Sequence, residues 1–481
     1  MAMTAYHDRR SRLFVDGAWI EGAAGTRPVV DKYTGESIGI VDQASRAQVD
    51  AAVAAARRSF VRTVLEPQQR YTMLMKTASL VDRYRDELAA LITAESGMPI
   101  ADATIETARA VQTIIVSAEE AKRLTGEMVP IESAPGQAHR LAFTIRVPRG
   151  VVCAITSFNS PLNMVAHKVA PALASGNTVV IKPPDVTPFS ATRLIELLLE
   201  AGCPPGHVNL VHGAGAELGP WLVDNPDISF YTFTGGTEVG MWIRERVGLR
   251  PVALELGSVT ATIVCEDADL ARAATRCAAS GFRRAGQMCT STQRLFVHAD
   301  VAEPFTARLI DAMRALKVGD PRDPTTDIGP MISEAEAMRA ETWVREAVAA
   351  GATVVEGGCR DGAVMSPTVL TGVAPSMRVM CEEIFAPVLS IVPYTDFDAA
   401  LEAVNATPFG LAAGLFTRDL TRAMTAARRI HVGVVHLNEA SSSRVDLIPF
   451  AGVKQSGVGR EGPKYAMQDM TEERLITISQ S

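Results

Sequence analysis

The sequence lacks the cysteine and histidine patterns that build disulfide frameworks or metal sites. It holds seven cysteines, an odd number, and no Cys-x-x-Cys pair occurs in its 481 residues. In so long a chain, scattered cysteines are typical of reduced thiols inside the cell. The eight histidines show no spacing that suggests metal ligation. We therefore predict a cytoplasmic protein with no metal site.

Long apolar runs and an excess of positive charge are absent as well. No apolar stretch approaches the roughly 20 residues of a membrane helix, and no apolar segment follows the charged Met1–Arg12 as a secretory signal requires. The last residues, Thr477–Ser481, match no lipidation motif. The 47 Lys and Arg against 54 Asp and Glu give a net charge of −7, whereas nucleic-acid binders usually carry a basic face. We expect neither a membrane nor a nucleic acid as partner.

The first third of the chain predicts helices. Ser45 and Gln48 have the spacing of a capping box that opens an Ala-rich helix. Pro67 begins a second helix, expected to run to Ser96, and a third follows over residues 101–124. Residues 127–149 then have the pattern of a hairpin with its tip near 134–136.

From Gly150 onward, short apolar strands alternate with amphipathic helices. The predicted strands cover residues 151–158, 178–181, 208–211, 228–233 and 252–256, and the alternation resumes after residue 261. Repeated βα units imply right-handed crossovers, so the sequence predicts a doubly wound parallel sheet of the α/β class. Such sheets bind ligands beyond the carboxyl ends of their strands.

Polar and Gly-rich segments follow several of these strands. Residues 233–240 read FTGGTEVG and open a helix whose free N–H groups suit a phosphate, although the same letters also fit a plain tight turn. Lys182 and Asp185 could bond ribose hydroxyls or form an ordinary solvated pair.

Three further residues have the chemistry of a catalytic site. Cys289 lies in a loop among small and polar residues, where backbone N–H groups can support a thiolate, although a cysteine can also stand there by chance. Glu255 ends an apolar strand and is either hydrogen-bonded or poised as a base. Asn159 ends another strand and can donate its amide to an oxyanion.

In this order the segments closely resemble the NAD(P)-dependent aldehyde dehydrogenase superfamily, from about Leu13 to Ile478. The matching motifs are SFNSP (157–161), KPPD (182–185), FTGGTEVG (233–240), LELGS (254–258), GQMC (286–289), EEIFAPV (382–388) and PFAGVKQSG (449–457). The final stretch resembles the branch of lactaldehyde and semialdehyde dehydrogenases. The resemblance implies a Rossmann-type NAD-binding domain (1–126 and 150–257), an α/β catalytic domain (258–450) and a small β oligomerisation flap (127–149 and 466–481), assembled as a homodimer or homotetramer.

The resemblance also implies how such an enzyme works. Cys289 attacks the aldehyde, Asn159 holds the oxyanion, and Glu255 activates the water that hydrolyses the resulting thioester. The implied cofactor-binding residues are Ser157, Phe158, Lys182, Pro184, Asp185, Gly235, Gly236, Thr237, Leu256, Glu383 and Phe385. Glu461 matches an acidic position that is sometimes linked to proton relay. Because an acid at 185 repels a 2′-phosphate, we predict NAD as cofactor, with NADP as the alternative.

The substrate is expected to be a small aldehyde, anionic or hydroxylated. Arginines suit a carboxylate or sulfonate, although each can equally form a structural ion pair; the candidates are Arg109, Arg283, Arg284 and Arg444. Two other functions stay open: a CoA-acylating relative, which typically lacks a Glu at position 255, and a thiol hydrolase without a cofactor, which would leave KPPD and EEIFAPV unexplained.

Overall fold

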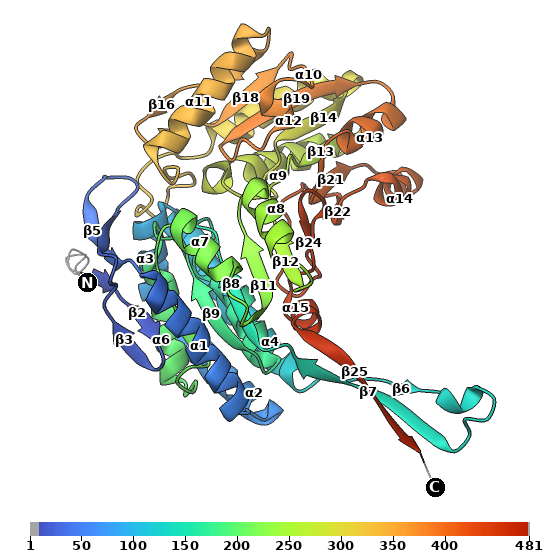
Figure 1. Cartoon of the computed structure of the whole chain (residues 1–481). Coiled ribbons are helices and arrows are strands. Elements are labelled where there is room, and N and C mark those ends of the chain that lie inside the picture. The colour runs from blue at the N-terminus through green and yellow to red at the C-terminus, as the bar shows by residue number, and fades with distance from the viewer. Residues whose placement is uncertain (1–8, 480–481) are drawn as a thin grey trace.

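Two mostly parallel sheets, each covered by helices on both faces, make up the body of the molecule (Figure 1). The structure is a computed structural model, and it describes residues 9–479. The first sheet has eight strands in the order β24-β12-β11-β8-β9-β10-β2-β3. Its central strands are mutually parallel, which confirms the predicted α/β class. These five are β8 (Val151–Ile155), β9 (Thr178–Lys182), β10 (Val208–Leu210), β11 (Ile228–Thr234) and β12 (Val252–Glu255).

Alternating side chains of this sheet fill two separate cores. Val152 and Ala154 of β8 face one core, and Val151 and Cys153 face the other, because successive strand residues point to opposite faces. The first core is covered by α2 (Pro67–Arg83), α3 (Arg85–Ser96), α4 (Ile100–Ala121), α5 (Asn163–Ala174) and α6 (Phe189–Glu200). The second is covered by α1 (Arg46–Arg62), α7 (Gly215–Val223) and α8 (Thr237–Arg246).

The predicted helix from Pro67 to Ser96 is wrong in one respect, because it is two helices. The chain leaves helical geometry at Tyr84, where φ is −99° and ψ is 23°, and α3 begins at Arg85. The break turns α3 towards α6 and a small sheet of β1 (Arg9–Ser11), β5 (Ser37–Asp42) and β4 (Thr26–Val30).

The second sheet has seven strands in the order β15-β18-β19-β14-β13-β21-β22. Its strands are β13 (Ala261–Val264), β14 (Arg294–His298), β15 (Thr353–Glu356), β18 (Thr368–Thr371), β19 (Val388–Tyr394), β21 (Ala412–Phe416) and β22 (Val434–Leu437). One face packs on α9 (Leu270–Phe282), α10 (Ala299–Arg314), α11 (Glu334–Ala349) and α12 (Arg378–Cys381), and the other on α13 (Phe397–Asn405) and α14 (Leu420–Arg429). Only the edge strand β15 runs antiparallel to its neighbour.

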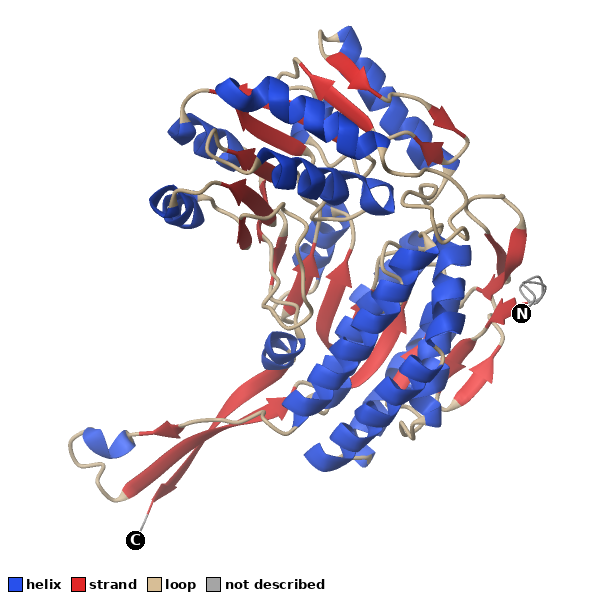
Figure 2. Cartoon of the chain, turned by 180° about the vertical axis from the view of Figure 1, so that it is seen from behind, coloured by secondary structure: helices blue, strands red, loops and turns tan. Residues whose placement is uncertain are grey.

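A narrow β-arm projects from the first sheet (Figures 1 and 2). It consists of β6 (Met128–Val129), β7 (Arg140–Pro148) and β25 (Thr471–Ser479). The predicted hairpin within 127–149 is short, since β6 spans only two residues, and β25 pairs with the whole length of β7. Residues 463–469 form α15 (Pro463–Asp469), which packs on α5 and α4. No helix within residues 9–479 is long and apolar enough to cross a membrane.

Candidate active site

The carboxyl ends of the parallel strands bring the motifs together. Asn159 follows β8, Lys182 ends β9, and Glu255 ends β12. Since β8 to β12 run in one direction, these side chains meet at one edge of the first sheet. That edge faces the second sheet, whose loops carry Cys289 and Glu383. The site therefore lies between the two sheets.

A cavity of about 770 Å³ opens beside this edge. Seven of the predicted cofactor residues line it: Ser157, Phe158, Lys182, Pro184, Asp185, Gly235 and Gly236. Trp242 and Ile243 of α8 and Pro220 and Val223 of α7 supply apolar walls. Such a cavity, mostly apolar with a few polar groups, is typical of a small-molecule or cofactor site.

Bare backbone lines the part of the cavity where a pyrophosphate would approach. No atom lies within 4 Å of the point where a Cβ would stand on Gly219 or Gly236. Gly236 is also the N-cap of α8, and no side chain caps that helix start, so its first N–H groups are available to an anion. These features fit a dinucleotide.

The remaining four predicted cofactor residues lie at the inner end of this region. Glu383 accepts a hydrogen bond from the N–H of Ser258 (2.9 Å), and burial raises its pKa to about 7. Thr237 Oγ1 accepts a hydrogen bond from the N–H of Gly257 (3.2 Å). A Cβ added at Gly257 would come within 2.7 Å of the Glu383 carboxyl, so the chain passes close to that side chain. Leu256 is buried against α8. The Phe385 ring meets the ring of Phe158 edge-on at 5.9 Å.

Cys289 lies in a loop between a 3₁₀ turn (Arg283–Gly286) and β14. Arg284 and Ala285 both have positive φ values, 53° and 52°, which ordinary residues seldom adopt. Gly286, with φ of 69°, lies so close to Ala386 that a Cβ would stand 2.1 Å from the Ala386 carbonyl oxygen. Only glycine fits there, and the contact fixes the loop against the EEIFAPV segment.

The Cys289 thiol is half-buried, and desolvation raises its pKa to about 12. Arg444 has the largest charge effect on it and works in the opposite direction, lowering the pKa. The thiol is therefore protonated at neutral pH, so its activation requires a base. This differs from the sequence-based expectation of a thiolate supported by backbone N–H groups.

The carboxyls of Glu383, Glu255 and Glu461 all act on the thiol, and of these three Glu255 is the one without a hydrogen-bond partner in the described part of the chain, so it can act as such a base. It is buried, and neither carboxyl oxygen has a hydrogen-bond partner among the described residues. Burial, with a smaller contribution from the charge of Glu461, raises its pKa well above the ordinary value. The two unpartnered oxygens leave room for a proton or a water molecule.

Glu461 lies beside this pair at the centre of a buried charge cluster. Its carboxylate accepts from Lys168 Nζ (2.8 Å) and from Arg444 Nη2 (2.9 Å). These two cations hold the pKa of Glu461 well below its usual range, despite burial. Arg444 also stacks on the Phe450 ring at 4.0 Å. Arg444, which the sequence offered as a substrate-binding residue, is therefore paired with Glu461, the predicted relay acid.

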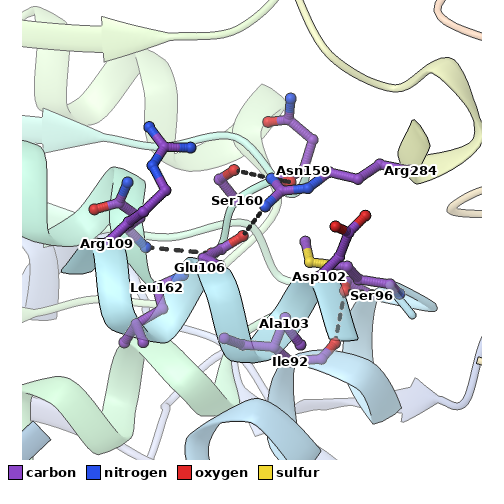
Figure 3. Close-up of polar contacts among 12 residues, drawn as sticks. Ile92, Ser96, Asp102, Ala103, Glu106, Arg109, Asn159, Ser160, Leu162 and Arg284 are labelled. Atoms are coloured by element: carbon purple, nitrogen blue, oxygen red, sulfur yellow. Dashed lines mark hydrogen bonds and ion pairs between the residues drawn. The ribbon is translucent and has the colours of Figure 1, made fainter. Parts of the chain in front are cut away.

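The amide of Asn159 donates to the carbonyl of Gln287 (2.8 Å), two residues before the nucleophile. The backbone carbonyl of Asn159 accepts from Arg284 (3.1 Å), which also donates to Ser160 and pairs with Glu106 of α4 (3.2 Å). Figure 3 shows Glu106 turned towards the Arg284 guanidinium. Arg284 therefore joins the turn before Cys289 both to α4, through Glu106, and to the Asn159 loop.

The other predicted substrate arginines are paired as well. Arg109 makes two bonds to Asp446 (2.8 and 3.1 Å), and His167 Nε2 donates to the same carboxylate (2.9 Å). Arg283 pairs with Asp102 (2.6 Å) and is 40% exposed. Structural ion pairs therefore account for both arginines. This is the alternative to substrate binding that the sequence leaves open.

Lys168, His167 and Glu106 were missed by the sequence-based search. Lys168 is fully buried in the largely apolar α5, and that contrast could have marked it as functional. Glu106 has no such signal, because its partner Arg284 is 178 residues away in the sequence.

Fold and site together define a class: an α/β oxidoreductase with a dinucleotide cavity beside a cysteine and a carboxyl group. The model of the aldehyde dehydrogenase family matches residues 19–476, and the chain belongs to that family. It is an NAD(P)-dependent enzyme that oxidises an aldehyde, as its motifs predicted.

Three known proteins show the likeness. The 3-sulfolactaldehyde dehydrogenase of Priestia megaterium is 48% identical over 467 residues, covering 97% of this chain and 98% of that protein. The structure of NADP-dependent glyceraldehyde-3-phosphate dehydrogenase from Bacillus halodurans, complexed with NADP, aligns with a TM-score of 0.96 at 35% identity, covering 98% of this chain and 100% of that one. Aldehyde dehydrogenase 21 from Physcomitrella patens, in complex with succinate, aligns with a TM-score of 0.95 at 35% identity, covering 98% and 99%.

Proposed function

We propose that this enzyme oxidises a small aldehyde that carries an anionic group, of the sulfolactaldehyde type, to the carboxylic acid. The observation that carries the proposal is Arg444. Its side chain is only 13% exposed, yet its charge acts on the Cys289 thiol more than that of any other residue. A buried guanidinium beside the reacting sulfur suits a substrate whose sulfonate or carboxylate is a few bonds from the carbonyl.

Cys289 is the nucleophile in this proposal. Its thiol adds to the aldehyde carbonyl to give a thiohemiacetal and is oxidised to a thioester. Because the thiol is protonated at neutral pH, it must give up its proton as it attacks, and the unpartnered Glu255 carboxylate can accept it. Asn159 turns its amide from the Gln287 carbonyl to the oxyanion. NAD(P), when bound, supplies the hydride acceptor.

Glu255 then acts as general base for the water that hydrolyses the thioester. Burial raises its pKa, so the carboxyl takes a proton from water more readily than an exposed glutamate does. Its presence beside the thiol supports water, not the thiol of CoA, as the acyl acceptor.

Asp185 supports NAD as the preferred cofactor. Its carboxylate lines the cavity beyond β9, where it suits ribose hydroxyls and repels a 2′-phosphate. A lower KM for NADP than for NAD would contradict this preference.

The β-arm supports a homodimer or homotetramer. Leu141 and Ile478 are exposed on β7 and β25, and a ribbon of so few strands gains stability from a partner.

We propose the division into a cofactor domain (1–126 and 150–257), a catalytic domain (258–450) and a flap (127–149 and 466–481). Residues 1–8 and 480–481 of these ranges lie outside the described part of the chain. The seven unpaired cysteines suit the proposed cytoplasmic location.

Matched aldehydes test the substrate proposal. Wild type and Arg444→Ala are assayed by NADH absorbance with 3-sulfolactaldehyde and with uncharged lactaldehyde. We expect KM for the sulfonate to rise by about 10- to 100-fold in the variant, since a charged hydrogen bond is worth roughly 1.5–3 kcal/mol, while KM for lactaldehyde changes little. Arg422→Ala, which removes a surface partner of Glu266, is the control. Equal changes for both aldehydes would count against an anionic substrate.

A further inference from the structure

Asp185, the residue on which the cofactor preference rests, is not a free carboxylate. The guanidinium of Arg27, on β4 of the small three-stranded sheet, donates to its Oδ2 atom. The Asp185 side chain is 17% exposed and that of Arg27 is 55% exposed, so the arginine covers the carboxylate from the solvent side. The two residues are 158 positions apart, and only the fold brings them together.

Two lysines add positive charge around the same carboxylate. Lys182 lines the cavity, and its Nζ donates to the Pro183 carbonyl (3.1 Å). Lys32 donates to the carbonyls of Val30 (2.9 Å) and Val186 (3.1 Å), and its charge interacts with that of Asp185.

Lys32 has acidic neighbours of its own, Glu95 and Asp31, which offset its charge. Among the described residues, Asp185 is the carboxylate that pairs with Arg27. Of the three cations, Arg27 is the one that forms an ion pair with Asp185, which itself lines the cavity.

An acid at this position selects NAD by bonding the ribose, and an arginine nearby selects NADP by bonding its 2′-phosphate. This chain has both residues, paired with each other. We propose that Arg27 is a cofactor-specificity residue: it neutralises Asp185 and offers its guanidinium to a 2′-phosphate, so that the enzyme accepts NADP beside its preferred NAD. The inference rests on the proposed placement of the dinucleotide in the cavity between β9 and α8.

The test is dinucleotide binding, measured by calorimetry without aldehyde. Wild type should bind NAD more tightly than NADP but bind both. Arg27→Ala should weaken NADP binding about tenfold or more, because a charge-assisted bond to phosphate is lost, and should change NAD binding less than twofold. Asp185→Ala should have the opposite effect, weakening NAD and strengthening NADP.

Arg58→Ala is the matched control, since Arg58 is 48% exposed and pairs with Asp16 at 2.9 Å on the same domain. It should leave both affinities unchanged. The inference is overturned if wild type binds NAD but not NADP, or if Arg27→Ala weakens both dinucleotides equally. Failure of wild type to bind either dinucleotide would instead refute the proposed cofactor cavity.

Discussion

The two sides of the site are built in opposite ways. The cofactor side is an open cavity whose walls are bare glycine backbone and apolar helix side chains, with a few charged groups, those of Lys182, Asp185 and Glu238. The aldehyde side is a packed set of buried ion pairs, in which Arg284, Arg109 and Arg444 each meet a carboxylate. One side provides space for a large ligand, and the other fixes a few polar groups around a small one.

This difference has an energetic consequence. An open cavity can be altered at little cost to folding, because nothing packs into it. A buried charge that loses its partner costs several kcal/mol, since the remaining charge stays desolvated. Changes on the aldehyde side should therefore affect both stability and turnover, whereas changes on the cofactor side should affect mainly binding.

The largest effect on turnover is expected from Glu255→Gln. The variant keeps the shape of the side chain but cannot accept a proton, so steady-state NADH production should fall by about 10²- to 10⁴-fold. Both steps should slow, because Glu255 takes the thiol proton and later activates the water, but hydrolysis should slow more, since the thiol can also lose its proton to solvent. Stopped-flow absorbance of NADH separates the two phases, and a uniform loss of both would argue against a role in hydrolysis.

Glu106→Gln should produce the largest loss of stability. It breaks the buried pair with Arg284, and such losses cost about 3–5 kcal/mol. Urea denaturation followed by circular dichroism measures the change. The control is Glu439→Gln, which breaks a more exposed pair with Arg276 and should cost about 1 kcal/mol or less. Equal losses would remove the proposed contrast between the two sides.

Sequence reasoning reached the cofactor side because its residues stand in contiguous motifs at strand ends. FTGGTEVG and KPPD each carry their chemistry within a few positions, and the alternation of strands and helices places them at one edge of the sheet. The aldehyde side was only partly predictable. The partners of Arg109 and Arg284 come from distant segments, 337 and 178 residues away, so sequence spacing carried no sign of these pairs.

Filling the cavity tests the cofactor side. Gly219→Leu puts a side chain into the cavity, where no atom beyond the helix's own backbone and the chain neighbours lies within 4 Å of the added Cβ. We expect NAD binding to weaken about tenfold or more, whereas the unfolding free energy should stay unchanged or rise slightly, because Gly within a helix is unfavourable. Calorimetry and urea denaturation measure the two effects. A large loss of stability would show that this side is packed like the other.

The smallest effect concerns the reactivity of the thiol. Arg444 lowers the pKa of Cys289 against the effect of burial, so Arg444→Ala should raise that pKa and reduce the thiolate fraction at any given pH. Alkylation by iodoacetamide at pH 8 should therefore be slower in the variant, by about threefold or more. In both proteins the rate should increase with pH. Faster alkylation of the variant would contradict the assigned charge effect.

The most direct test of the account is to trap the acyl group on Cys289. Glu255→Gln is mixed with NAD and 3-sulfolactaldehyde, quenched in acid and digested, and the peptide containing Cys289 is weighed by mass spectrometry. The account predicts that this peptide gains the mass of the acyl group, and that Cys289→Ala yields neither the adduct nor NADH. An adduct on another residue, or NADH from Cys289→Ala at a rate near that of wild type, would contradict it.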